Sequence, residues 1–371
     1  MFSSRLHWDL KPNPIAALLR EKRERGGSVL DLTESNPTRA GFEYPSGLLE
    51  PDAAAMQYDP APRGMLAARE AVAAYQGVPA DRLILTASTS ESYAFLFKLL
   101  CDPGDEVLTP RPSYPLFEFL ASLESVHVKQ YPLAYHEGWW LDFDELPRMV
   151  TPRTRAILLV NPNNPTGSYL KRRELEQLLA LARATDMAII SDEVFSDYAF
   201  GPDESRVSTL ATCDEVLTFT LSGLSKVCAL PQMKLGWITA SGPRHEEALE
   251  RLELIADTYL SVSTPVQLAA PRMLDTRHSV QFQIRERTQR NLAALEGRQL
   301  RVEGGWYATV QVPRTRSEEN WALDLLRSEN VLVQPGYFFD FHAEAFLVLS
   351  LLTKPEIFAE GVRRIFDFSA G

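Results

Sequence analysis

The sequence predicts an α/β fold, with a large domain whose mostly parallel sheet lies between helices and a smaller α+β domain. Two observations predict it. Short apolar, strand-like runs alternate with helical patterns through the middle of the chain, which is typical of a parallel sheet covered on both faces. The last third changes character and combines an amphipathic helix with further short strands.

The large domain is predicted from four strand-like runs. The first, 83–85, leads through a small polar cluster into a helical stretch. The second, 156–160, ends at an Asn-Pro-rich turn, and a helix follows whose apolar residues recur at i, i+3, i+4 and i+7 from Leu175. The third and fourth runs are 187–190 and 216–221. These elements predict the strand–helix–strand order of a parallel sheet.

The last third predicts the smaller domain. Residues 285–295 form a charged amphipathic pattern, and 305–312 alternate like a half-buried strand. Short strands are expected at 332–333 and 346–350.

Domain boundaries are expected near Thr264-Pro265, inside or beside a helix, because no linker composition separates the two parts. We predict a large domain over 45–266. The small domain would combine the N-terminal segment 1–44 with 267–371.

Bulk composition excludes several classes of protein. The 371 residues are 45% hydrophobic and carry a net charge of −11, which disfavours a general nucleic-acid or anionic-membrane binder. Three cysteines without CxxC spacing indicate a reducing compartment rather than a disulfide framework. Residues 1–10 lack the apolar core of a signal peptide, and no apolar run is long enough to span a bilayer. We therefore expect a cytoplasmic protein.

Polar side chains follow the predicted parallel strands where each strand ends. Asn164, Asp192 and Lys226 each occupy such a position, and ligands of open α/β sheets bind outside those strand ends. A fourth cluster between a strand and a helix could hold a phosphate at the positive end of the helix. It consists of Ser88, Thr89 and Ser90.

This combination of groups fits pyridoxal phosphate (PLP). A lysine can hold the aldehyde as an imine, a carboxylate can keep the pyridine nitrogen protonated, and an amide can donate to the ring 3′-oxygen. Each motif alone has a simpler explanation as a turn or a helix cap. Their occurrence together at strand ends favours the cofactor site. No HExxH, GxSxG or GxGxxG motif is present, and no metal site is expected.

Several motifs resemble one family across nearly the whole chain. They are similar to the signature of the aspartate aminotransferase family, the class I/II aminotransferases of PLP fold type I. The resemblance rests on Asn161–Gly167, Ser191–Val194, Ser225-Lys226, Lys234–Gly236, Asp102–Val107, Pro112–Pro115 and, with one extra residue, Tyr58–Gly64.

The resemblance implies a role for each matching residue. Lys226 would form the Schiff base and move the substrate proton, Asp192 would pair with the pyridine nitrogen, and Asn164 would bind the 3′-oxygen. Tyr114 would stack on the ring. The phosphate would be held by Ser88, Thr89, Ser225 and Lys234.

The same resemblance predicts how the chain assembles and closes. Tyr58 would reach the phosphate of a neighbouring subunit, which implies a homodimer with shared active sites. Ser35 and Asn36 belong to a segment similar to the one that closes over substrate.

Three positions depart from the family pattern. Phe195 stands where a tyrosine usually donates to the 3′-oxygen, and Lys234 stands where arginine usually binds the phosphate. Val348 occupies the place of the arginine that binds the substrate α-carboxylate. Another basic group, with Arg39 or Arg63 as candidates, could supply that charge. Alternatively the substrate lacks this carboxylate, or the chain has lost transamination.

The predicted function is transfer of an amino group between an amino acid or related amine and a 2-oxo acid. A PLP-dependent lyase acting by carbon–sulfur cleavage or another β-elimination is the alternative on the same fold, and a non-catalytic PLP-binding protein is a third. Aromatic residues could line a pocket for a bulky substrate or belong to the small-domain core. They are Trp306, Tyr307, Tyr337, Phe338 and Phe339.

Overall fold

The computed structural model describes residues 2–6, 8, 11–50 and 53–370. Of the first ten residues, on which the expectation about a signal peptide rests, 1, 7, 9 and 10 lie outside this part. Within the described part, none of the helices combines the length and apolarity needed to cross a bilayer.

An eight-stranded sheet forms the centre of the larger part, with strand order β2-β9-β8-β7-β6-β3-β4-β5. Strands β8, β7, β6, β3 and β4 run parallel to their neighbours in this order. Strand β9 is antiparallel to both β2 and β8, and β5 forms an antiparallel pair with β4. The mostly parallel sheet is therefore confirmed. The strands are β2 Leu83–Thr86, β3 Glu106–Arg111, β4 His127–Tyr135, β5 Trp139–Leu141, β6 Thr154–Val160, β7 Ala188–Asp192, β8 Thr218–Gly223 and β9 Gly236–Ser241.

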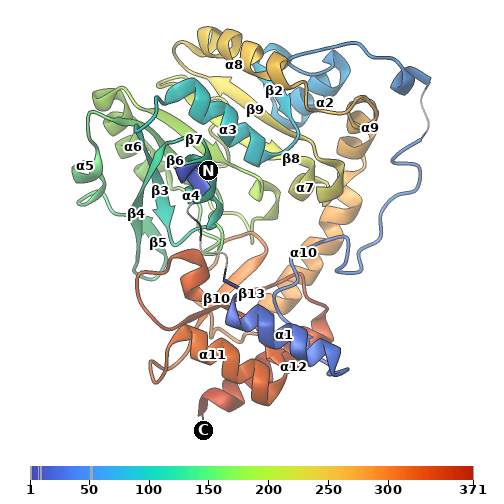
Figure 1. Ribbon diagram of the computed structural model, residues 1–371, viewed down its shortest axis with the longest axis vertical. Helices are drawn as coiled ribbons and strands as arrows, with labels where there is room; N and C mark the ends of the chain where they lie inside the picture. The colour runs from blue at the N-terminus through green and yellow to red at the C-terminus, as the bar shows by residue number, and fades with distance from the viewer. Residues whose placement is uncertain (1, 7, 9–10, 51–52, 371) are drawn as a thin grey trace.

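Helices cover both faces of this sheet (Figure 1). One face packs against α3, α4 and α8, and the other against α5 and α6, with α2 and α9 beside β2 and β9. Every residue of β7 and β8 is buried, as expected for strands covered on both sides. The helices are α2 Leu66–Gln76, α3 Thr89–Leu100, α4 Leu116–Leu123, α5 Leu146–Met149, α6 Arg172–Thr185, α7 Leu224–Val227, α8 His245–Tyr259 and α9 Thr264–Asp275.

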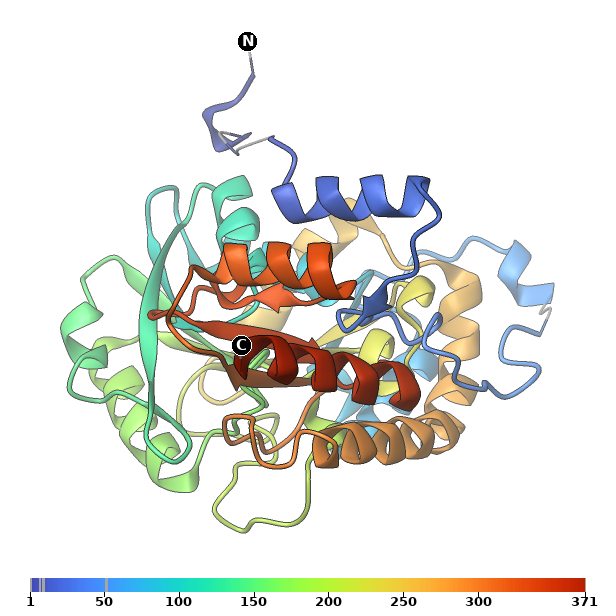
Figure 2. The ribbon, with the colours of Figure 1, turned by 90° about the horizontal axis from the view of Figure 1, so that it is seen from below.

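The smaller part is built on a three-stranded antiparallel sheet of order β10-β13-β12, with α1, α11 and α12 packed around it (Figure 2). Its core contains residues from both ends of the chain, since Ile15 and Leu32 pack with Leu347 and Leu349. A short parallel pair between β1 and β11 ties the N-terminal segment to the C-terminal part. The elements are α1 Pro14–Glu24, β1 Leu30–Asp31, β10 Tyr307–Gln311, α11 Glu318–Asp324, β11 Val331–Leu332, β12 Gln334–Pro335, β13 Phe346–Ser350 and α12 Pro355–Ala370.

The long helix α10, Arg277–Ala293, runs between the two parts (Figure 1). It begins eight residues before the predicted helix, because Val280 and Ile284 also bury their side chains. The polar and charged residues around these two positions hide the apolar pattern in the sequence. The domain boundaries at 44/45 and 266/267 remain a prediction. Short helical turns complete the chain: η1 Ser4–Leu6, η2 Ala53–Met56, η3 Ala80–Arg82, η4 Ser196–Tyr198, η5 Pro231–Met233, η6 Leu325–Glu329 and η7 Gly336–Phe339.

Candidate active site

Lys226 lies in the short helix α7, directly after the buried strand β8. Its amine faces two aromatic rings, with Nζ 5.6 Å from the centre of the Phe195 ring and 5.2 Å from the Trp306 ring. Burial lowers the pKa of this amine, and the charge of Asp192 opposes the shift. A larger share of the amine is therefore neutral and nucleophilic near pH 7 than for an exposed lysine.

Asp192 ends β7, the strand next to β8, so its carboxylate lies at the same sheet edge as Lys226. Tyr93 of α3 donates its hydroxyl to Oδ2 at 2.7 Å, and the Val194 amide donates to Oδ1 at 3.2 Å. Burial raises the pKa of Asp192, while those hydrogen bonds and the Lys226 charge lower it. A cationic partner at this carboxylate would favour its ionised form further. Tyr93 was not predicted from the sequence.

The polar cluster after β2 caps helix α3. Ser88 Oγ accepts a hydrogen bond from the Glu91 amide at 3.2 Å, and Thr89 and Ser90 open the first turn. The amides of a first helical turn have no acceptor within the helix, so this end can bind an anion. Gly236 lies against the cap, since a Cβ there would come within 2.9 Å of the Ser88 carbonyl carbon.

The two other residues expected near the phosphate are less enclosed. Ser225 precedes Lys226 in α7 and is half-buried, whereas the Lys234 side chain is exposed. Lys234 ends η5 in a left-handed conformation two residues before Gly236. Lys234 is therefore two residues from Gly236, and Gly236 lies against the α3 cap.

The Asn-Pro segment after β6 uses its asparagines differently. Asn161 donates to the Val207 carbonyl and accepts from the Leu170 amide, so its role is structural. Asn164 is buried, and its Oδ1 has no hydrogen-bond partner within the described part of the chain. A buried amide left in this state is suited to an additional polar group.

Aromatic side chains surround the lysine. Phe195 packs edge-on against Trp306 at 5.2 Å and against Tyr307 at 6.3 Å. Tyr198, three residues after Phe195, donates its hydroxyl to the Lys226 carbonyl at 2.7 Å. Trp306 is fully buried in this cluster and not in the core of the smaller part.

Tyr114 and Tyr58 differ in their surroundings. Tyr114, just before α4, is 46% exposed, and its pKa is raised by burial and by the charge of Asp192. Tyr58 is 78% exposed and far more open to solvent than a residue serving its own chain's site would be.

The N-terminal segment reaches the same region from the smaller part. Ser35 is hydrogen-bonded to the Tyr307 hydroxyl, and the Glu34 carbonyl accepts from Ser350 Oγ at 2.5 Å. Asn36 uses its Oδ1 locally, accepting from the Thr38 amide and hydroxyl. The structure therefore brings Ser35 to the site and leaves the Asn36 side-chain oxygen in a turn.

Val348 lies at the centre of the three-stranded sheet, paired with Thr309 on one side and Gln334 on the other. Its strand neighbours Leu347 and Leu349 point into the small core, so Val348 points to the opposite face. Thr309 Oγ1 and Gln334 Oε1 are buried without a hydrogen-bond partner in the described chain. Position 348 therefore offers an aliphatic side chain on this face and no positive charge for a substrate carboxylate.

Of the two arginines considered as replacements, one forms an ion pair and the other is exposed. Arg63 is paired with Glu253 of α8 at 2.7 Å. Arg39 is exposed in the N-terminal segment, three residues after Asn36.

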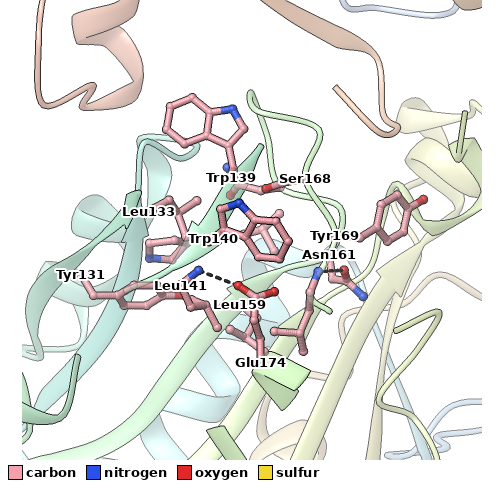
Figure 3. A pocket seen from close by; sticks show the side chains of 14 residues that line it. Tyr131, Leu133, Trp139, Trp140, Leu141, Leu159, Asn161, Ser168, Tyr169 and Glu174 are labelled. Atoms are coloured by element: carbon pink, nitrogen blue, oxygen red, sulfur yellow. Dashed lines mark hydrogen bonds between the residues drawn. The ribbon is translucent and has the colours of Figure 1, made fainter. Parts of the chain in front are cut away.

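A separate small pocket lies between the β4–β5 hairpin and the end of β6 (Figure 3). Trp139, Trp140 and Tyr169 contribute its aromatic lining, and Glu174 accepts from the Leu141 amide at 2.7 Å. Its side chains join the core on the α6 face of the sheet, opposite the face on which Asp192 meets Tyr93. It is therefore distinct from the site around Lys226.

Comparison with known proteins agrees with the predicted fold and family. The family model "Aminotransferase class I and II" matches residues 55–365. Alanine aminotransferase of Mycobacterium tuberculosis (strain ATCC 25618 / H37Rv) is 29% identical over 369 residues, covering 92% of this chain and 86% of that protein. The glutamate-pyruvate aminotransferase of Haemophilus influenzae is 29% identical over 346 residues, covering 86% of this chain and 85% of its own.

A solved structure gives the same result. Alanine aminotransferase from Pyrococcus furiosus superposes with a TM-score of 0.88 at 25% identity, covering 100% of both chains. The predicted fold and family resemblance are confirmed. The chain is an enzyme that belongs to the class I and II aminotransferase family.

Proposed function

We propose that this enzyme uses PLP to move an amino group between an amino acid or related amine and a 2-oxo acid. The observation that carries the proposal is the position of Lys226 beside Asp192 at adjacent strand ends, with an amine whose pKa is lowered by desolvation. Transfer rather than elimination is supported by the relatives, which are named as alanine and glutamate-pyruvate aminotransferases.

The residues present fit the cofactor. Asn164 offers a buried amide whose NH2 group can donate to the ring 3′-oxygen, and the α3 cap against Gly236 offers a compact anion cradle. PLP when bound supplies an electron sink that stabilises negative charge at the substrate Cα. Asp192 would hold a proton on the ring nitrogen through a charge-assisted hydrogen bond.

Each remaining residue contributes binding or proton movement. The Lys226 amine would take the proton from the substrate Cα and return it, since its neutral form is favoured by burial. Ser88, Thr89, Ser90, Ser225 and Lys234 would hold the phosphate. Tyr114 and Phe195 would confine the ring, and Phe195 brings no donor to its 3′-oxygen.

We propose further that two copies of the chain associate. Tyr58 is 78% exposed, and Met56 and Leu66 nearby in sequence are 90% and 56% exposed. An apolar, exposed segment of this kind is suited to burial against a second copy, where Tyr58 would reach the other phosphate site.

The cysteines are free thiols in the structure, which supports our proposal of a reducing, cytoplasmic location.

Borohydride reduction of the PLP-loaded protein tests the central assignment. Peptide mass spectrometry should find the cofactor on Lys226, and Lys226→Ala should remove the label while Lys171→Ala, a lysine paired with Glu303, should keep it. In a separate sample that has not been reduced, amino acid substrates should yield a 2-oxo acid and an aminated cofactor in equal amounts. Labelling of another lysine would refute the site, and release of ammonia without aminated cofactor would favour the lyase.

A further inference from the structure

Arg111 ends β3 at the same sheet edge as the candidate site. The pairing of β3 with β6 ends at Leu108 and Ile157, and the same register extended by three residues would set Arg111 beside Val160, which pairs with Asp192. Aligned residues of parallel strands share a face. Arg111 and Asp192 therefore lie on one face, two strands and roughly 10 Å apart at their Cα atoms.

The guanidinium of Arg111 has few partners of its own. Its Nε is buried without a hydrogen-bond partner in the described chain, and its Nη2 lies 3.1 Å from Nδ1 of His342. Among the ion pairs of the described residues, none involves Arg111. A cation is thus held at the sheet edge without a protein carboxylate beside it.

Two other arginines with an unpartnered Nε provide a comparison. Arg206 lies 3.5 Å from the Glu303 carboxylate, so its charge is compensated. Arg277 stacks 5.0 Å from the centre of the Tyr75 ring. Arg111 differs because neither a carboxylate nor an aromatic ring accompanies it in the described part.

Contacts around Arg111 connect it to the lysine. The Ser113 amide donates to the Phe339 carbonyl at 2.9 Å, so the end of β3 touches η7 of the smaller part. The Phe339 ring lies 6.5 Å from Tyr307, which lies 6.3 Å from Phe195, the ring that Lys226 faces. The end of the strand that carries Arg111 is therefore linked, through η7 and these rings, to the side chains around Lys226.

We propose that Arg111 binds the substrate carboxylate from the large sheet, in place of a basic residue at position 348. This inference rests on the proposed function and narrows its substrate to an amine that carries a carboxylate. A carboxylate would accept from the buried Nε and a neighbouring amino group of the fork, which satisfies the unpartnered donor. The substrate carboxylate then points toward β3, and an apolar substituent can face Val348.

Binding of two ligands that carry no amine separates this role from catalysis. Calorimetry would compare 3-phenylpropionate with 3-phenylpropanamide, which differ in the charged group, on the PLP-loaded and cofactor-free protein. The wild type should bind the carboxylate about tenfold more tightly or better, as for hydrogen bonds to a charged group. Arg111→Gln should bind both alike, Arg111→Lys should keep part of the preference, and Arg39→Gln should keep all of it.

Three results would overturn the proposal: no preference in the wild type, an unchanged preference in Arg111→Gln, or its loss in Arg39→Gln. If Arg111→Gln does not fold, as judged by circular dichroism, Arg111→Lys decides, and an undiminished preference there contradicts the role. Because neither ligand reacts, the binding comparison does not depend on the labelling of Lys226. Failure of the Arg111 proposal can therefore be distinguished from failure of the proposed function.

Discussion

Tyr93→Phe removes one hydroxyl from the candidate site and leaves the ring in place. That ring packs 5.4 Å from Phe117 and 6.1 Å from Phe97, so the core around it is kept. The hydroxyl donates to Asp192 at 2.7 Å in a fully buried setting. A hydrogen bond to a charged group contributes about 1.5–3 kcal/mol, which corresponds to a rise of about 1–2 units in the pKa of Asp192.

The direction of the pH effect follows from burial. The pKa of Asp192 is raised in the folded protein, so its favourable contribution is present at low pH and lost as pH rises through the folded pKa. Tyr93→Phe raises that pKa further. The cofactor-free variant should therefore lose more unfolding free energy at pH 7 than at pH 4, by about 1.5–3 kcal/mol at pH 7. If Asp192 acts ionised, the acid limb of the kcat profile should move to higher pH.

Urea unfolding at the two pH values and a kcat–pH profile measure these effects. Tyr131→Phe is the matched control, because its buried hydroxyl donates to the Leu158 carbonyl at 2.8 Å on the other face of the sheet. The control should lose about 1 kcal/mol at both pH values and keep the acid limb. Equal pH dependence in the two variants would refute the coupling between Tyr93 and Asp192.

Two further predictions concern the ring and the phosphate cradle. Phe195→Tyr should lower the pH midpoint of the bound cofactor's absorbance band in a spectral titration, because a hydroxyl would stabilise the anionic 3′-oxygen; an unchanged midpoint would contradict the predicted contact. Gly236→Ala should cost about 1–3 kcal/mol of unfolding free energy and weaken PLP binding, since its Cβ would meet backbone atoms of Ser88 and Thr89 at 2.9 and 3.0 Å. Gly138→Ala is the control, because its Cβ would meet nothing closer than 3.6 Å, and it should change neither the unfolding free energy nor PLP binding. Equal losses of PLP binding in the two variants would refute the phosphate site at the α3 cap.

Much of the site could be predicted because it follows local sequence. Lys226, Asp192 and Asn164 each stand within a few residues of the end of an apolar run, and such runs form buried parallel strands whose ends meet at one edge. Strand β9 was not predicted. Its antiparallel place between β2 and β8 depends on pairing with strands far away in the chain.

The contacts that tune the site could not be predicted in the same way. Tyr93 meets Asp192 across 99 residues of sequence, and only the packing of α3 on the sheet sets that distance. Arg63 was a candidate for binding the carboxylate until its pairing with Glu253 placed it elsewhere. Such pairings depend on side-chain direction, which composition and periodicity do not encode.

The sequence by itself determined the strand-end residues, the apolar runs that bury their strands, and the absence of a basic residue at Val348. Tertiary structure decided which charges face one another: the lowered pKa of Lys226, the Tyr93 hydrogen bond, and the unpaired Arg111 at the sheet edge. The physical reason is that the local pattern of apolar residues indicates which segments are buried, whereas electrostatic and hydrogen-bond energies depend on distances set by distant parts of the chain.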